Sequence, residues 1–401
     1  MLGGTIRRHP EDFLVEEIPL VSPTGQGEHV IAQIEKRGIS TLDALLFLSK
    51  AAKVSERQIG YAGLKDARAV TRQYVSFPRI APERVAALEG PRFRVLSVAR
   101  HPHGLKIGHL KGNRFTIRIR GVDMERVPAA RLALEEIARR GMPNPYGGQR
   151  FGTKGDSHLL GRAILEQDWA GFLDRLLGQP SPLEHDERTR RARESWEAGR
   201  REEAFALWPN KRRSEKKALS TLLRSGSPRE AFEALGTHPR RIWLSAWQSW
   251  IFNRVLGRRE AEGSWDQLLP GDIAWLSASG ATYHALAGPR DEERARSLTA
   301  SATGPLPGYD MKLAAGAPGA IEREVLAEEG CDPEAFRAVH ARMRGSRRPL
   351  RIAVREASLE VESPAVVSVR FVLPPGAFAT VLLAILMEGG AEGEDEDDAP
   401  E

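Results

Sequence analysis

One acidic side chain lies in a short segment whose residue types could support covalent chemistry. Asp66 stands in the loop Gly63–Ala69, next to Lys65 and close to Arg68. Nearby cations keep a carboxylate ionised, and glycine lets a substrate approach the backbone closely. An ionised carboxylate can act as a nucleophile without an adjacent base. The same residues also fit an exposed aspartate that forms a turn or an ion pair, so both interpretations remain open at this point.

The sequence motifs of several common enzyme classes are absent. The chain contains no P-loop, no G-x-G-x-x-G, no H-E-x-x-H and no G-x-S-x-G. Its single cysteine, Cys331, excludes an internal disulfide and the zinc deaminase site, which needs two thiolates. His101, His103 and His109 lie close together, but without an adjacent carboxylate this spacing is more typical of a surface loop than of a metal site. We therefore expect no metal and no cofactor.

The charge balance favours a polyanionic partner. The 401 residues include 59 Lys and Arg and 54 Asp and Glu, a net charge of +5. Eight of the acidic residues lie in 388–401, so residues 1–387 carry 59 − 46 = +13. A body this basic commonly binds nucleic acid. No apolar run is long enough to span a membrane, and with a single cysteine the chain is expected to be cytoplasmic.

The elements on either side of Asp66 can be predicted from local patterns. Short apolar alternation, broken by prolines and glycines, predicts strands and turns up to Arg37. Ser40 with Asp43 three residues later predicts the start of a helix. The strands predicted around the loop cover residues 58–62 and 70–77. Asp66 is therefore expected at the tip of a loop between two strands.

Further along the chain the pattern changes twice. Residues 114–120 alternate regularly between apolar and polar side chains, which predicts a half-buried strand. The pattern of residues 124–141 predicts a helix that ends at Gly141. All eight tryptophans lie in the mainly helical segment that follows, which indicates a second domain. Strand patterns return between 350 and 373, before a final helix at 378–387. We predict one discontinuous domain, 1–143 and 304–388, an inserted domain, 144–303, and a disordered acidic tail, 389–401.

Residues 62–73 resemble the A-G-x-K-D-x-R-A-x-T-x-Q signature of the TruD family of tRNA pseudouridine synthases. Four other segments resemble motifs of that family and occur in the same order. They are Pro10–Glu17 (P-x-D-F-x-V-x-E), Leu110–Phe115 (L-K-G-N-x-F), Gln149–Gly152 (Q-R-F-G) and Leu373–Thr380 (L-P-x-G-x-F-A-T). Together the five motifs extend over nearly the whole chain.

The resemblance implies an α/β (α+β) fold, in which a catalytic domain with a mixed, largely antiparallel sheet carries a mainly helical insertion. It implies isomerisation of uridine, at position 13 of tRNA, with no cofactor and with Asp66 as the catalytic residue. Arg7 or Lys65 is expected to keep Asp66 charged. The resemblance also implies that Phe13, Phe115, Phe378 and Asn113 line the uridine pocket. From the residues alone, the phenylalanines would be core and Asn113 a turn residue.

Two matters stay open at the level of sequence. Asp66 could attack the ribose C1′, attack C6 of the base, or remove a ribose proton to give a glycal. A non-catalytic RNA-binding protein or RNA chaperone would have the same basic body, whereas a methyltransferase would usually need a glycine-rich cofactor loop that is not found. The oligomeric state is not encoded in any pattern, and a monomer is the default expectation.

Overall fold

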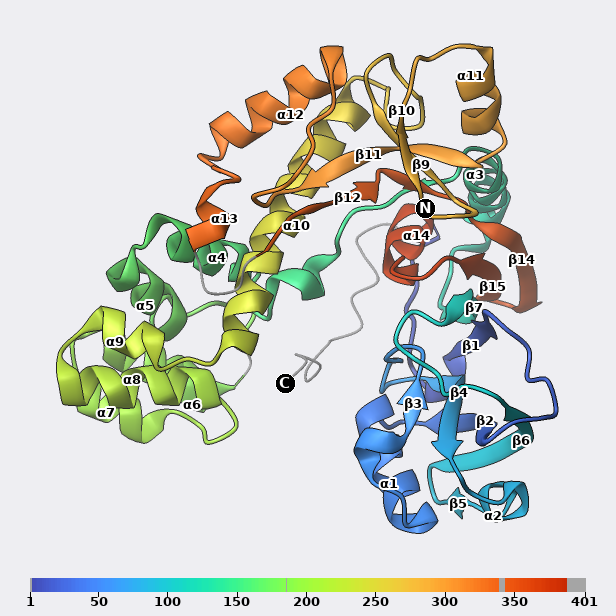
Figure 1. Cartoon of the computed structure of the whole chain (residues 1–401), viewed down its shortest axis with the longest axis horizontal. Helices are drawn as coiled ribbons and strands as arrows, with labels where there is room; N and C mark the ends of the chain where they lie inside the picture. Colours follow the sequence, from blue (N-terminus) through green and yellow to red (C-terminus); the bar gives the residue numbers. More distant parts are fainter. Residues whose placement is uncertain (1, 185, 339–342, 388–401) are drawn as a thin grey trace. The chain divides into compact units, whose positions relative to one another are not determined.

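The computed structural model describes residues 2–184, 186–338 and 343–387. It divides the chain into two compact units, shown in Figure 1. We call residues 2–142 with 352–387 the sheet unit, and residues 143–351 the helical unit. The second boundary differs from the predicted 303/304, because residues 300–306 form a strand of the helical unit and not a linker. The predicted acidic tail, 389–401, lies outside the described residues.

The sheet unit is built around a nine-stranded sheet. Its elements are η1 (Pro10–Asp12), β1 (Phe13–Pro19), β2 (His29–Arg37), α1 (Thr41–Ala52), η2 (Glu56–Gln58), β3 (Gly60–Tyr61), β4 (Val70–Pro78), α2 (Pro82–Ala86), β5 (Glu89–Gly90), β6 (Phe93–His101), β7 (Leu110–Arg120), η3 (Met124–Arg126), α3 (Val127–Arg140), β14 (Arg355–Ser363), β15 (Val366–Leu373) and α14 (Ala379–Leu386). The strand order is β14-β15-β7-β1-β4-β2-β6-β5, and β3 also pairs with β4. Only β1 and β4 run parallel in this sheet, so the predicted mixed, largely antiparallel sheet is confirmed.

Local sequence signals account for several of these elements. The Ser40 side chain accepts a hydrogen bond from the Asp43 backbone N–H, which caps the first turn of α1 as predicted. In β7, Phe115, Ile117 and Ile119 are buried, while the alternating residues, Arg114, Thr116, Arg118 and Arg120, lie on the opposite face. One apolar core is shared by α3, α14 and the β1, β7 and β15 part of the sheet, and a second by α1 and the β2 and β4 part.

Gly112 allows two strands of the sheet unit to come close together. A Cβ atom added to Gly112 would lie 2.4 Å from the Leu373 carbonyl oxygen, which is backbone and cannot move aside easily. We expect Gly112→Ala to destabilise the protein by about 1–3 kcal/mol, the usual cost of overpacking. Gly257→Ala is the control, because Gly257 lies in a helix and has nothing within 4 Å of an added Cβ. Urea unfolding of both variants checks this, and equal midpoints would contradict it.

The helical unit contains a long central helix and a small sheet. Its elements are η4 (Gly148–Phe151), α4 (Ser157–Glu166), α5 (Trp169–Leu177), α6 (Glu187–Glu197), α7 (Arg201–Leu207), α8 (Arg213–Ser225), α9 (Pro228–Glu233), α10 (Thr237–Ala261), β9 (Ile273–Leu276), β10 (Thr282–His284), α11 (Pro289–Arg296), β11 (Ala300–Leu306), α12 (Gly316–Glu328), α13 (Ala335–Ala338) and β12 (Ser346–Pro349). The four strands follow the order β10-β9-β11-β12. Within this unit, Figure 1 shows α10 running from the cluster α4–α9 to the small sheet. The pair β8 (Met142–Pro143) and β13 (Arg351–Ile352) forms a separate two-stranded sheet.

The only cysteine of the chain is buried in the core of the helical unit. Burial raises the pKa of the Cys331 thiol to about 12. The unfolded thiol ionises near pH 8.5, so stability contributed by the neutral buried thiol is present below that pH and is lost as the pH rises toward 12. We expect iodoacetamide at pH 9 to alkylate Cys331 rapidly in urea and very slowly in the native protein. Rapid alkylation of the native protein, measured by mass spectrometry, would contradict the burial.

Among the described residues, no helix combines the length and apolar character needed to cross a bilayer.

Candidate functional site

The parallel pairing of β1 with β4 places the Asp66 loop beside the start of β1. Leu14, the second residue of β1, pairs with Val70, the first residue of β4. Because parallel strands begin at the same edge of a sheet, the segments that precede both strands meet there. The first is the N-terminal segment with Arg7, and the second is the loop with Asp66. Two parts of the chain about sixty residues apart therefore form one site.

Asp66 is held by a buried guanidinium group. Arg7 Nη2 lies 2.8 Å from Asp66 Oδ2, and the Arg7 side chain is 8% exposed whereas that of Asp66 is 34% exposed. The Arg7 guanidinium also lies over the Phe13 ring, 4.5 Å from its centre. Arg7 is therefore fixed on one side by an aromatic ring and binds Asp66 on the other. The arrangement leaves a carboxylate that is ion-paired and still partly open to solvent.

Lys65 contacts a different carboxylate. Its Nζ lies 2.7 Å from Glu17 Oε2, and the two side chains are 5% and 1% exposed. Glu17 also accepts a hydrogen bond from the Tyr74 backbone N–H. The ion pair joins the loop to β1, in the interior of the sheet unit. Of the two cations proposed to keep Asp66 charged, the structure shows Arg7 in contact with it.

Two of the predicted pocket aromatics lie mainly in the core. Phe13 is 1% exposed and Phe115 is 7% exposed. Their ring centres are 6.2 Å apart in an edge-to-face arrangement, and Phe115 stacks on Phe371 at 5.2 Å. These contacts link both rings to Arg7, and through it to Asp66. As expected for ordinary core residues, most of the surface of both rings is buried.

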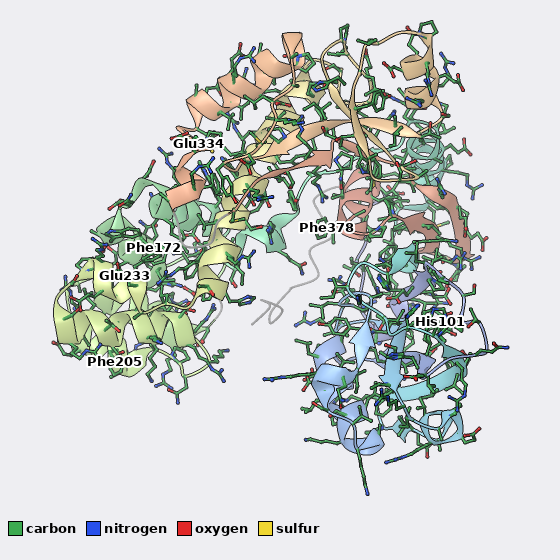
Figure 2. All side chains as sticks on the ribbon, in the orientation of Figure 1. His101, Phe172, Phe205, Glu233, Glu334 and Phe378 are labelled. Carbon is green, nitrogen blue, oxygen red and sulfur yellow. The ribbon has the colours of Figure 1, made fainter. Side chains whose placement is uncertain are left out.

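Asn113 lies on β7, and Phe378 lies at the start of α14, after the end of β15. Asn113 pairs with Glu17 on β1 and with Leu373 on β15. Its Oδ1 is buried and has no hydrogen-bond partner among the described residues. Phe378, labelled in Figure 2, is half-buried and forms the N-cap of α14, shortly after Leu373 ends β15. Of the predicted residues, Arg7 contacts both Asp66 and Phe13. Lys65 forms an ion pair with Glu17, and Asn113 is the strand neighbour of Glu17.

Several polar residues of this face were not predicted from the sequence. Glu17, Lys36, Thr71 and Gln73 are each buried on strands β1, β2 and β4, together with Thr41 at the start of α1. Regular alternation would place apolar side chains at these inward-facing strand positions. A charged or amide side chain at such a position was the signal available in the sequence. These residues form a buried polar strip between the two apolar cores.

The opposite face of the sheet is a ladder of ion pairs. Arg72 lies 2.8 Å from both Glu16 and Glu35, and Glu35 also binds Arg94 at 2.7 Å. Burial opposes ionisation of Glu35, but hydrogen bonds from Arg72 and Arg94 outweigh it and lower its pKa. These half-exposed pairs satisfy each other and are expected to contribute little to chemistry. The chemically distinctive face is the other one, whose Glu17 and Lys36 contact the Asp66 loop.

The described residues contain no group of three or more His, Cys, Asp and Glu that could hold a metal ion.

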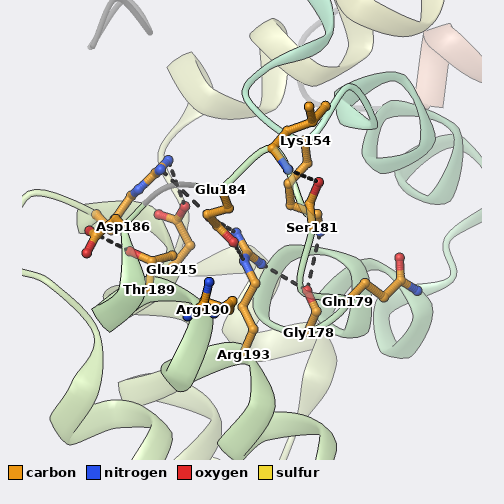
Figure 3. A network of polar contacts seen from close by, with 12 residues as sticks. Lys154, Gly178, Gln179, Ser181, Glu184, Asp186, Thr189, Arg190, Arg193 and Glu215 are labelled. Atoms are coloured by element: carbon orange, nitrogen blue, oxygen red, sulfur yellow. Dashed lines mark hydrogen bonds and ion pairs between the residues drawn. The ribbon is translucent and has the colours of Figure 1, made fainter. Parts of the chain in front are cut away.

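The helical unit contains a charged stretch, residues 184–217, that is only partly a surface feature. Arg193 is buried and binds Glu184, with Nε at 2.6 Å and Nη2 at 3.2 Å from the carboxylate oxygens. Figure 3 shows the polar contacts around this pair. Arg193 and Lys154 both donate to the Gly178 carbonyl oxygen, and burial lowers the pKa of Lys154. Part of this charged stretch therefore stabilises the interior of the helical unit. Arg191, Arg213 and Lys217 remain exposed on α6 and α8.

Comparison with known proteins gives a consistent result over the whole chain. Residues 1–385 match the family model described as tRNA pseudouridine synthase D (TruD). The chain is 45% identical over 390 residues to tRNA pseudouridine synthase D of Geobacter metallireducens, covering 97% of this chain and 96% of that one. It is 43% identical over 395 residues to the protein of that name in Geobacter sulfurreducens, covering 98% and 95%. A crystal structure of a protein proposed to be tRNA pseudouridine synthase D from Methanosarcina mazei matches with a TM-score of 0.80 and 29% identity, covering 96% of this chain and 94% of that one.

Proposed function

The chain belongs to the TruD family of tRNA pseudouridine synthases, and from this premise we propose that it isomerises uridine 13 of tRNA with Asp66 as the catalytic residue. The family makes it an isomerase that acts on tRNA. The target position and the role of Asp66 are the parts that we propose. The observation that supports Asp66 most directly is its geometry, a partly exposed carboxylate bound at 2.8 Å by the buried Arg7.

The reaction breaks the bond between N1 of uracil and C1′ of ribose, rotates the base, and forms a bond from C5 to C1′. The proton on C5 is lost, and N1 gains one, so the atoms balance without an oxidant or reductant. Ionised Asp66 can attack C1′ or C6, or remove a ribose proton to give a glycal. Arg7 places a positive charge 2.8 Å from the carboxylate that each of these three routes uses.

The surroundings of Asp66 support binding of an extruded base. Extruding a base from its stack costs a few kcal/mol, which aromatic contacts and hydrogen bonds in the site can offset. We propose that Asn113, with its buried Oδ1 unpaired within the described residues, contributes to holding the polar edge of uracil. Phe13, Phe115 and Phe378 would line the apolar side of the uracil pocket, and Phe378 is the most exposed of the three. Exposed cations of the helical unit would bind phosphates of the tRNA.

A non-catalytic RNA-binding protein remains the alternative function to test. We expect purified protein, incubated with an unmodified tRNA transcript and no added cofactor, to convert uridine 13, detected by carbodiimide labelling and primer extension. A transcript with cytidine at position 13 is the control and should gain no label. Binding without conversion would favour the non-catalytic alternative. Conversion at another uridine would refute the target position but not the activity.

A further inference from the structure

The tip of the Asp66 loop is held by side chains from neighbouring elements. Leu64, Lys65 and Asp66 belong to no helix or strand. Backbone hydrogen bonds fix the ends of the loop, from Gly108 N–H to Ala62 and from Gly38 N–H to Ala69. At the tip, Lys36 and Thr41 bind the backbone of Lys65 and Asp66 instead. The loop backbone that carries the Asp66 carboxylate is therefore fixed by these two side chains, in addition to the ion pairs of Asp66 with Arg7 and of Lys65 with Glu17.

Lys36 reaches the tip from a central strand. It lies on β2, where it pairs with Thr71 of β4, and it is fully buried. Its Nζ donates to the carbonyl oxygens of Asp66 at 2.7 Å, Ile39 at 2.6 Å and Lys65 at 3.4 Å. Hydrogen bonds from an ammonium group are stronger than those between neutral groups. Since burying a charge is costly, such a residue is expected where its bonds fix something the protein needs.

Thr41 adds a second, directional connection. Its Oγ1 accepts a hydrogen bond from the Lys65 N–H at 2.9 Å and donates to Gln73 Oε1 at 3.0 Å. Because the hydroxyl has one proton, accepting from Lys65 leaves that proton for Gln73. Gln73 lies on β4, so this connection also ends on the sheet. Two adjacent strands therefore hold the loop through separate contacts.

We propose that Lys36 is a positioning residue for Asp66, and that its ammonium, supported by Thr41 and Gln73, sets the place of the carboxylate relative to the substrate. The proposal rests on the catalytic role proposed for Asp66. Lys36 is buried behind the loop and acts through its backbone, so it affects the rate of isomerisation and not the binding of tRNA. A displacement of about 1 Å at a reacting group can lower a rate by about 10²-fold.

The test uses two variants of the full chain and one control. Lys36→Met keeps a long side chain but removes its donors, and Thr41→Val removes one hydroxyl. Arg84→Met is the control, because Arg84 also donates to a backbone carbonyl, that of Ala52, but at the end of α1. Single-turnover conversion at saturating protein, tRNA binding by filter retention and thermal melting are measured for each.

We expect Lys36→Met to lower the single-turnover rate constant by about 10²-fold and Thr41→Val by about 10-fold, with Kd for tRNA within about 2-fold of the parent. The control should keep the parental rate. A folded Lys36→Met protein with the parental rate, or one whose rate and tRNA binding fall together, would overturn the proposal. Should Lys36→Met fail to fold, Thr41→Val decides, and an unchanged rate then overturns it. Conversion by Asp66→Asn would refute the catalytic role instead, whatever these variants show.

Discussion

Asp66→Asn is expected to lower the rate of pseudouridine formation by at least about 10³-fold, as removal of a catalytic nucleophile does in other enzymes. The amide cannot attack C1′ or C6 and cannot accept a proton at neutral pH. Binding of tRNA should be retained, because phosphate contacts provide most of the affinity and lie elsewhere. Single-turnover conversion of a tRNA transcript, with Kd measured in parallel, checks both parts.

A matched control is available in the same unit. Asp123 is also partly exposed and also paired with an arginine, with Oδ2 3.1 Å from Arg126 Nε. Asp123→Asn removes the same charge, so a general electrostatic effect on tRNA binding would appear in both variants. We expect it to keep the parental rate. Conversion by Asp66→Asn at a rate close to that of the control would refute the catalytic role of Asp66.

Glu184→Ala is expected to destabilise the helical unit by about 3–5 kcal/mol, because it leaves the buried Arg193 without its carboxylate partner. Arg193 and Glu184 are only 4% and 1% exposed, so solvent cannot replace the lost interaction. All eight tryptophans lie between residues 169 and 275, in the helical unit. Urea unfolding followed by tryptophan fluorescence therefore reports on this unit.

Two further variants separate a buried pair from a surface pair. Glu194→Ala removes a carboxylate that pairs with Arg190 on the exposed face of α6, and should change the unfolding midpoint little. The double change Glu184→Met with Arg193→Met removes both charges and should destabilise less than Glu184→Ala alone. If Glu184→Ala and Glu194→Ala unfolded at the same urea concentration, the structural role of Glu184 would be wrong.

Local pattern was sufficient for most of the sheet unit. The alternation in residues 114–120 predicted β7, and the Ser40 and Asp43 signal predicted the start of α1. The strands around the Asp66 loop were also predicted, and they appear as β3 and β4. Each of these signals lies within a few residues of the element that it specifies. Such signals are readable because backbone geometry repeats over two residues in strands and 3.6 in helices.

The predicted site residues needed the family motifs as well as the local pattern. Asp66 was identifiable as a carboxylate on a glycine-bounded loop, but the residues alone favoured an ordinary turn or ion-paired aspartate, and only the family motifs indicated the catalytic role. Phe13 and Phe115 would have been assigned to the core, and the structure places most of their surface there. Their contact with Arg7 and Asp66 depends on the pairing of β1 with β4 and β7, which joins residues far apart in the chain.

By itself, the sequence determined that a basic chain with one cysteine carries a carboxylate on a loop between two strands, because composition and periodicity are local properties. Only the tertiary structure decided that Arg7 binds Asp66 while Lys65 binds Glu17, and that Lys36 holds the loop from behind. These partners are set by which strands lie side by side and in which direction. Neighbouring cations look alike in a sequence, and the fold alone gives each its own carboxylate.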